Sequence, residues 1–434
     1  MTPGARLQSA IELLTAVKNA AAPADRVTTR FFRARRFAGS KDRRAITERL
    51  YEILRRQGEL TWRLEEIGAP LTPRWLVLAA LVCFDDMPPA EIAALFDGAR
   101  FTPAVLDDEE RALLARLAVP PEETMPDWAA GNYPSWLESA VKQRYGADWA
   151  AEMAAATDRA PVDLRVNSLK STRAKVLAEL KESGIEAAAC PFAPLGIRLA
   201  ERERITGHPL YEQGAIEVQD EGSQLVAHLV AAEPGHQVVD LCAGAGGKSL
   251  ALAAAMQNSG QIYACDIDRR RLAELSNRMQ RAGVRNLQVR PLSAAIDGRL
   301  TDLQGHADRV LIDAPCSGSG TWRRNPDQKW RLTADDMDRY VRTQDNLLRR
   351  GGELTRPGGR LIYATCSFLA EENERRVERF LKLTPAFHCL PITDIWLDLK
   401  DGSGPIDTGE YLALSPAKHG TDAFFAAVLE RQAD

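Results

Sequence analysis

Two cysteines in this sequence stand where a nucleophile would be useful. Cys316 lies in DAPCSGSG and Cys366 in YATCS, and each comes at or just after a short apolar run, RVLID at 309–313 and RLIYATC at 360–366. Both are flanked by proline, glycine or serine rather than by further apolar residues. Thiolates are strong nucleophiles, and a thiol placed in a loop without a function would be open to oxidation. Because ligands bind at the carboxyl ends of strands in α/β sheets, we expect both thiols in one active site.

The remaining cysteines do not indicate a disulfide framework or a metal centre. The chain has seven cysteines, an odd number spread along its length, without a CxxC pair or the Cys/His spacing of a zinc site. Both kinds of site need such spacing. Cys83, Cys190 and Cys265 are typical of small buried apolar side chains. We therefore expect free thiols in a reducing compartment and no bound metal.

A glycine-rich turn, DLCAGAGGKSL at 240–250, follows a further strand-like run. It is not a P-loop, because that motif needs glycine where Cys242 stands, and it lacks the third glycine of the dinucleotide fingerprint. A glycine turn still lets a ligand approach the amides of a helix N-terminus, and the aspartate that ends the next strand could bind ribose hydroxyls. This combination favours S-adenosylmethionine; the alternative is a structural turn with a surface aspartate. The expected cofactor contacts are Cys242, Ala243, Gly244, Ala245, Gly246, Gly247, Lys248 and Asp266.

The elements that would position these residues alternate between strand and helix from about residue 215. Strand-like runs at 237–242, 261–266, 309–313 and 360–366 are separated by amphipathic stretches such as 268–283. Alternation of this kind predicts an α/β fold, a Rossmann-like parallel sheet with helices on both faces.

The first half of the chain follows other patterns. Residues 1–125 show only helical spacing, and 119–136 is rich in proline and turn residues, as linkers are. A strand at 162–167, a helix at 170–184 and two weaker strands then suggest a small mixed unit. We predict an all-helical domain at 1–125, a linker and α+β subdomain at 126–214, and the Rossmann-like domain at 215–434.

Charge and hydropathy limit the possible partners. The net charge is −4, yet residues 26–56 hold eleven Lys/Arg against three acids, with aromatic residues between them. Such a stripe is typical of a nucleic-acid surface and equally of a solvated helix face. The apolar run WLVLAALVCF at 75–84 is too short to cross a membrane. With no targeting segment recognised, we expect a cytoplasmic monomer without a membrane partner.

Three motifs together carry a family resemblance. DLCAGAGGK, LIDAPCSGSG with RRNPDQKW, and YATCSFLAEENE resemble the motifs of the RNA cytosine carbon-5 methyltransferases, the NOL1/NOP2/Sun family. LRVNSLKSTR, VQDEGSQLVA and HGTDAFFAAVLER are similar to further parts of that pattern, so the resemblance covers roughly 130–434. The helical N-terminus resembles the NusB-like RNA-binding domain of the bacterial Sun/RsmB-type branch. This resemblance implies methylation of cytosine in RNA, most directly 16S ribosomal RNA, with S-adenosylmethionine as donor.

The resemblance also implies a role for each reactive residue. Cys366 would add to carbon 6 of cytosine, which turns carbon 5 into a nucleophile toward a methyl donor. Cys316 would assist release of the product, and Asp313 would bind the Watson–Crick edge of the base close to the cofactor methyl. Lys248 would either lower the pKa of the thiolate or contact the cytosine; the sequence leaves both open.

The RNA contacts and the adenine site are open as well. Arg323, Arg324 and Lys329 would hold the flanking RNA backbone, or would be an exposed basic loop. Where the family often places an adenine-binding carboxylate, this chain has Ser293, with Asp297 four residues on. Two other functions stay open: the same chemistry on transfer RNA, and a non-catalytic RNA-binding or ribosome-assembly factor, against which the retention of both cysteines argues.

Overall fold

The computed structural model describes residues 1–293, 298–398 and 409–433. The chain forms two compact units. The first comprises Met1–Asp158 together with Trp322–Leu332, and the second comprises Arg159–Thr321 and Thr333–Asp434. Within the described residues, no helix is both long and apolar enough to span a membrane.

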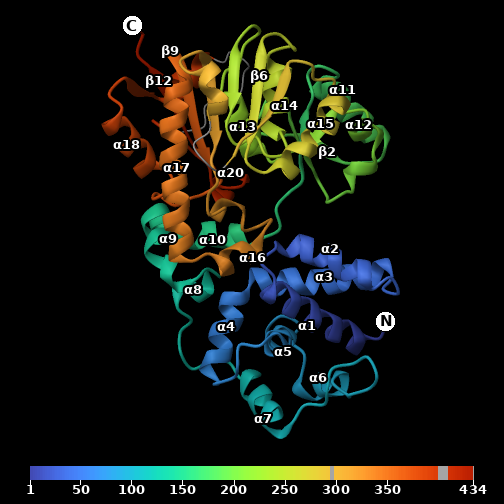
Figure 1. The fold of residues 1–434 in the computed structure, drawn as a ribbon. Coiled ribbons are helices and arrows are strands. Elements are labelled where there is room, and N and C mark those ends of the chain that lie inside the picture. The colour runs from blue at the N-terminus through green and yellow to red at the C-terminus, as the bar shows by residue number, and fades with distance from the viewer. Residues whose placement is uncertain (294–297, 399–408, 434) are drawn as a thin grey trace. The chain divides into compact units, whose positions relative to one another are not determined.

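The first unit is helical, as predicted, and residues 1–125, all of which are described, contain no strand. Its helices are α1 (Pro3–Asn19), α2 (Ala24–Ala34), α3 (Ser40–Arg55), α4 (Gln57–Glu66), α5 (Pro73–Cys83), α6 (Pro89–Leu95), α7 (Asp108–Leu117), α8 (Asp127–Ala130), α9 (Glu138–Tyr145), α10 (Trp149–Thr157) and α16 (Pro326–Arg331) (Figure 1). Helices α8 to α10, which lie in the range expected for the linker and α+β subdomain, pack with this unit.

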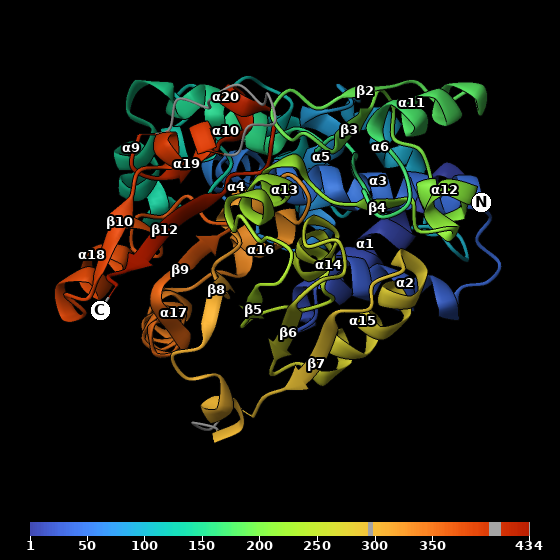
Figure 2. The same cartoon turned by 90° about the horizontal axis from the view of Figure 1, so that it is seen from above.

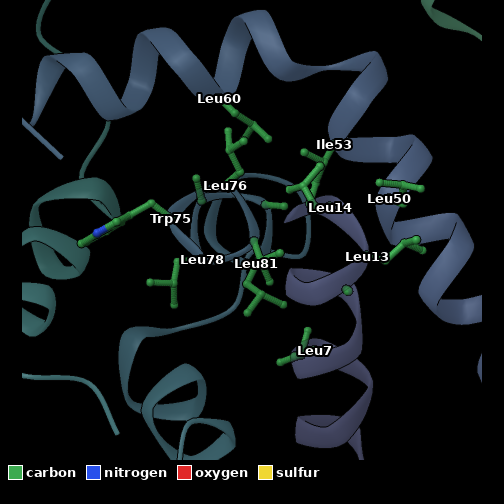
Figure 3. Close-up of a cluster of buried hydrophobic side chains, with 14 of the residues drawn as sticks. Leu7, Leu13, Leu14, Leu50, Ile53, Leu60, Trp75, Leu76, Leu78 and Leu81 are labelled. Atoms are coloured by element: carbon green, nitrogen blue, oxygen red, sulfur yellow. The ribbon is translucent and has the colours of Figure 1, made fainter. Parts of the chain in front are cut away.

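Helix α5 forms the centre of the helical core. Its residues from Trp75 to Leu81 are all buried, as expected for a helix that is apolar on every side. Leu14, Ile53 and Leu60, from α1, α3 and α4, gather around it (Figure 3). The apolar run at 75–84 is therefore explained by this core position.

Helix α16 comes from far along the chain, and its side chains form hydrogen bonds with backbone groups at three helix ends of this unit. Helix termini leave backbone amides and carbonyls without partners inside the helix. The side chains of α16 meet the ends of α1 and α3 and the start of α2. The hydrogen bonds are Arg331 Nη1 to Ala22 O (2.6 Å), Arg331 Nη2 to Val17 O (3.1 Å), Ala24 N to Asp327 Oδ2 (3.1 Å), Lys329 Nζ to Arg55 O (2.8 Å) and Trp330 Nε1 to Leu54 O (2.7 Å).

The second unit begins with the small α+β part. Its antiparallel sheet has the order β2-β3-β1-β4. The elements are β1 (Asp163–Val166), α11 (Arg173–Glu182), β2 (Ala187–Ala189), β3 (Gly196–Leu199), α12 (Pro209–Glu212) and β4 (Ile216–Val218). Val176 and Leu180 of α11 pack on Leu164 and Ile197 of the sheet. The predicted strand, helix and two weaker strands are confirmed, and β4 completes the sheet.

The larger sheet has eight strands in the order β10-β12-β9-β8-β5-β6-β7, with β11 paired to β12 (Figure 2). The adjacent strands β9, β8, β5, β6 and β7 run parallel to one another. Strand β12 pairs antiparallel with β9, and β10 and β11 pair antiparallel with β12. The strands are β5 (Gln237–Asp240), β6 (Gln261–Asp266), β7 (Leu287–Pro291), β8 (Ala307–Asp313), β9 (Thr355–Thr365), β10 (Phe387–Leu390), β11 (Leu412–Ala413) and β12 (Phe425–Arg431). The predicted parallel sheet is thus its central part.

Helices cover both faces of this sheet. They are α13 (Glu221–Leu229), α14 (Gly247–Ala255), α15 (Arg269–Ala282), α17 (Ala334–Leu354), α18 (Glu374–Leu383), α19 (Ile392–Asp398) and α20 (Pro416–His419). Side chains alternate along each strand, so Leu311 packs in the core with α13 to α15 while its neighbour Ile312 packs in the core with α17 and α18. The fold is the predicted α/β type.

Candidate functional site

The carboxyl ends of four neighbouring strands bring the predicted reactive residues together. Parallel strands β8 and β9 are in register with Asp313 opposite Ala364. Cys316 follows Asp313 by three residues and Cys366 follows Ala364 by two, and their Sγ atoms lie 3.5 Å apart. The turn after β5 and the aspartate that ends β6 come next in the strand order. This is the edge at which open α/β sheets bind ligands.

The two thiols are free, half-buried and within hydrogen-bonding distance of each other. The pKa of Cys316 is raised well above its usual value, first by the hydrogen bond with Cys366, then by burial and by the charges of Cys366 and Glu372. Either sulfur can be the donor of this pair, and the raised pKa favours the protonated form of Cys316.

Backbone hydrogen bonds join the loop that carries Cys316 to the end of β9 and to the residues just before β12. Gly320 N donates to Cys366 O (3.0 Å), and Gly320 O accepts from Ala423 N (3.0 Å). A Cβ atom at position 320 would lie only 2.1 Å from Ala423 O. Glycine is thus required for the approach of these backbones, which explains the second glycine of the GSG sequence.

Lys248 and Asp313 form an ion pair, with Nζ and Oδ2 2.7 Å apart. The lysine side chain is buried, and a third of the aspartate side chain is exposed. Lys248 Nζ also lies 5.4 Å from the centre of the Phe424 ring. The lysine therefore orients the aspartate and leaves part of its carboxylate accessible.

The glycine turn has the geometry needed for a close-fitting ligand. Gly246 precedes α14 with φ +80°, and a Cβ atom there would lie 2.1 Å from Leu275 Cδ1. Asp266 accepts hydrogen bonds from Gly244 N and Asp268 N, both at 2.7 Å. Since a carboxylate can accept about four hydrogen bonds, Asp266 retains capacity for ribose hydroxyls. These residues fit a nucleoside-containing cofactor.

The other residues of the turn are placed as follows. Ala243 N donates to Cys265 O (2.9 Å), and Gly246 N donates to Ala243 O (2.7 Å), which closes the turn. Burial raises the pKa of the Cys242 thiol well above its usual value, so this cysteine is a neutral lining residue. Ser293 is half-buried two residues after β7, and Asp297 lies outside the described residues.

Two arginines that sequence reasoning missed hold the carbonyls of the turn. Arg165 of β1 donates to Gly247 O at 2.6 Å, and Arg278 of α15 donates to Ala245 O at 2.7 Å. Arg278 also pairs with Glu217 of β4 at 2.9 Å. The α+β subdomain therefore helps to shape the turn. Arg165 lies within the LRVN sequence, but nothing in that sequence indicates its partner.

The structure does not support the predicted RNA contacts of Arg323 and Lys329. Both side chains are buried, with exposed fractions of 5% and 1%. Lys329 donates to the last carbonyl of α3 and lies near the rings of Trp322 and Trp330. Burial lowers its pKa to about 7. Arg324 is half-buried. The position of Lys329 thus reflects packing within the helical unit.

One group of possible metal ligands occurs in the described part of the chain, formed by Asp163, Cys190 and Glu221. Its carboxylates already have partners. Arg198 pairs with Asp163 at 2.7 Å and with Glu221 at 3.3 Å, and Glu221 accepts the amides of residues 192 and 193. These contacts are those of a structural cluster.

Most of this chain is similar to known proteins. Residues 227–430 match the family model described as 16S rRNA methyltransferase RsmB/F, and residues 133–206 match an RsmF/B-like ferredoxin-like domain. A relative from Synechocystis sp., a probable ribosomal RNA small subunit methyltransferase B, is 31% identical over 412 residues, which cover 90% of this chain and 91% of that protein.

Two solved structures are similar over long stretches. The crystal structure of PH0851 is 28% identical, covers 99% of both chains and has a TM-score of 0.80. A methyltransferase homolog protein from Pyrococcus horikoshii is 30% identical and covers 70% of this chain and 97% of that chain, with a TM-score of 0.60.

Proposed function

This chain belongs to the RsmB/F family of 16S rRNA methyltransferases, and from that premise we propose that it methylates carbon 5 of a cytosine in small-subunit ribosomal RNA. It is an S-adenosylmethionine-dependent methyltransferase. The observation that carries the cytosine proposal is the pair of thiols, 3.5 Å apart at the ends of adjacent parallel strands. An RNA-binding or assembly factor without catalysis would have no use for them.

When bound, S-adenosylmethionine supplies an electrophilic methyl group. The residues that would hold it are those of the turn at 242–248, with Asp266 on the ribose. Ser293 would lie toward the adenine.

The protein's own residues prepare the base for methylation. The Cys366 thiolate adds to carbon 6, and the electron pair moves toward carbon 5, which becomes nucleophilic. Asp313, oriented by Lys248, binds the edge of the base at which charge develops. After methylation a water molecule takes the proton from carbon 5, the electron pair of that C–H bond restores the double bond between carbons 5 and 6, and the bond from carbon 6 to sulfur breaks, so that Cys366 leaves with the electron pair. Cys316 assists this release. No metal is needed, and we take the protein to act as a cytoplasmic monomer.

Covalent trapping tests this proposal. Cys316→Ala and Cys366→Ala variants are incubated with small-subunit ribosomal RNA and S-adenosylmethionine, and denaturing gels are used to detect protein–RNA adducts. We expect an adduct to accumulate with Cys316→Ala and none with Cys366→Ala, and bisulfite sequencing then locates the cytosine. The reverse pattern would exchange the two roles. Adducts with transfer RNA alone would reassign the substrate, and neither adduct nor methylation with any RNA would refute the enzyme.

A further inference from the structure

A wholly buried carboxylate lies behind the two thiols and has no role in the chemistry above. Glu372 has an exposed fraction of 0% and follows the strand that leads to Cys366. Ser317 donates to it twice, from its amide to Oε1 at 2.8 Å and from its hydroxyl to Oε2 at 2.5 Å. Gln344 of α17, also buried, donates from Nε2 to Oε1 at 3.0 Å. The carboxylate is therefore directly bonded to the residue that follows Cys316.

Gln344 also holds the loop on the other side of Cys316. Gln344 Nε2 also donates to Pro315 O at 3.0 Å. Pro315 and Ser317 are the two chain neighbours of Cys316, so Glu372 and Gln344 together hold the backbone on either side of that thiol. Ser317 Oγ also contacts Ser367 Oγ at 3.3 Å. Ser367 is the residue next to Cys366, and the network thus joins the neighbours of both cysteines.

The charge of Glu372 has no cationic partner among the described residues, and its partners there are neutral donors. Burying a carboxylate without a counter-ion is costly, so its presence in such a place points to a functional reason. A charge placed here also favours the protonated form of Cys316, because the carboxylate is one of the causes that raise the pKa of that thiol.

We propose that Glu372 is a positioning residue for the release step, which holds the Cys316 loop so that its thiol stays beside Cys366. The inference rests on the proposed function. In release, the bond between carbon 6 of the base and the Cys366 sulfur breaks, and the electron pair stays on sulfur. The S–H of Cys316 can donate to that sulfur as charge develops, provided that the separation near 3.5 Å is maintained. Glu372 touches neither the base nor the cofactor in this scheme.

Glu372→Gln in the full-length protein is the decisive variant, because the amide keeps the size of the side chain and removes the charge. Glu371→Gln is the matched control, since Glu371 is the adjacent residue and its side chain forms an exposed pair with Arg375. Each protein, in excess over small-subunit ribosomal RNA, is mixed with methyl-labelled S-adenosylmethionine and quenched in denaturant over time. The adduct, the methylated free RNA and the thermal midpoint are measured.

For Glu372→Gln we expect the adduct to form at close to the wild-type rate and to decay about tenfold more slowly, part of the 10²–10⁴-fold that a positioned proton donor contributes. Turnover should fall by a similar factor with little change in KM, because the lost interaction acts after binding. Ser317→Ala, which removes one donor and no charge, should change the adduct lifetime in the same direction by less. It keeps the test open if Glu372→Gln does not fold.

A general loss of structure would slow formation and decay of the adduct alike, and that result would overturn the inference. So would an adduct lifetime in folded Glu372→Gln equal to that of wild type. If the wild-type protein gives neither adduct nor methylated RNA, the proposed function fails and this inference fails with it. Normal wild-type turnover with an unchanged adduct lifetime in the variant refutes the role of Glu372 alone.

Discussion

Three cysteines near the candidate site have raised thiol pKa values for different reasons, and the reasons separate their uses. Burial is the main cause for Cys242 and Cys265, so both are neutral lining groups. For Cys316 the main cause is the hydrogen bond with Cys366. That hydrogen bond keeps Cys316 beside Cys366, which is the position that the proposed release step requires.

At the residue scale, we predict that the charge of Lys248 is needed for methylation. Lys248→Met removes the cation that lies 2.7 Å from Asp313 and leaves the carboxylate without its partner. We expect ribosomal RNA methylation to fall about 10²-fold, as when one preorganised electrostatic contact to the reacting group is lost. Initial rates at saturating S-adenosylmethionine measure the effect.

The matched control for this change is Lys175→Met. Lys175 forms an exposed pair with Glu179 on α11, 3.9 Å apart, and exposed pairs contribute only about 0–1 kcal/mol. It should leave the methylation rate unaltered. Equal losses of rate in the two variants would show that Lys248 has no special part in orienting Asp313.

That Cys316 and Cys366 lie at one edge of the sheet could be predicted from the sequence, and most partners of the candidate site residues could not. The types and loop positions of Cys316 and Cys366 indicate one site, because parallel strands end at a common edge. The sequence left two roles open for Lys248, since strand order decides that it meets Asp313. It also shows the charge of Lys329 but not its burial, which depends on α3.

At the scale of elements, the backbone conformation of the turn before α14 should determine the affinity for S-adenosylmethionine. In Gly246→Ala, alanine would have to adopt the left-handed conformation that glycine has here, at φ +80°. Its Cβ atom would also lie 2.1 Å from Leu275 Cδ1, a core atom, and clash with it. The conformation alone costs about 1–2 kcal/mol. We expect a lower thermal midpoint and a weaker affinity for S-adenosylmethionine, measured by calorimetric titration.

Gly184→Ala separates the two causes of this loss. Gly184 has φ +76° and no atom within 4 Å of an added Cβ, so its replacement carries the conformational cost without the clash. It should lower the midpoint less and leave cofactor affinity intact. If both variants bound the cofactor as wild type does, the shape of the turn would not matter for binding.

The periodic patterns predicted the elements that carry the site better than those around it. Strand β6 has the predicted bounds of 261–266, and α15 covers nearly all of 268–283. The apolar residues there repeat with the period of one face. Helix α10 reads WAAEMAAAT, where alanine gives little contrast between faces. The antiparallel pairing of β12 with β9 depends on contacts that no local pattern contains.

At the scale of the whole molecule, the helical unit is discontinuous in the chain. Its last segment, Trp322–Leu332, comes from between Thr321 and Thr333, both of which belong to the second unit. Only five residues separate Cys316 from this segment. The helical unit is therefore completed by residues that follow the Cys316 loop in the sequence.

This connection predicts where the helical unit opens when α16 loses its contacts. In a full-length Asp327→Ala, Arg331→Ala double variant, Ala24 N and the carbonyls of residues 17 and 22 lose their hydrogen bonds to α16. Loss of a helix cap costs about 0.5–2 kcal/mol, and local opening follows local stability. Hydrogen exchange measured by mass spectrometry should therefore quicken at the end of α1 and the start of α2, while α15 keeps its wild-type protection. Arg349→Ala, which breaks only an exposed pair with Glu353 on α17, should alter neither region. Unchanged exchange in α1 and α2 of the double variant would mean that the helical unit is stable without this segment.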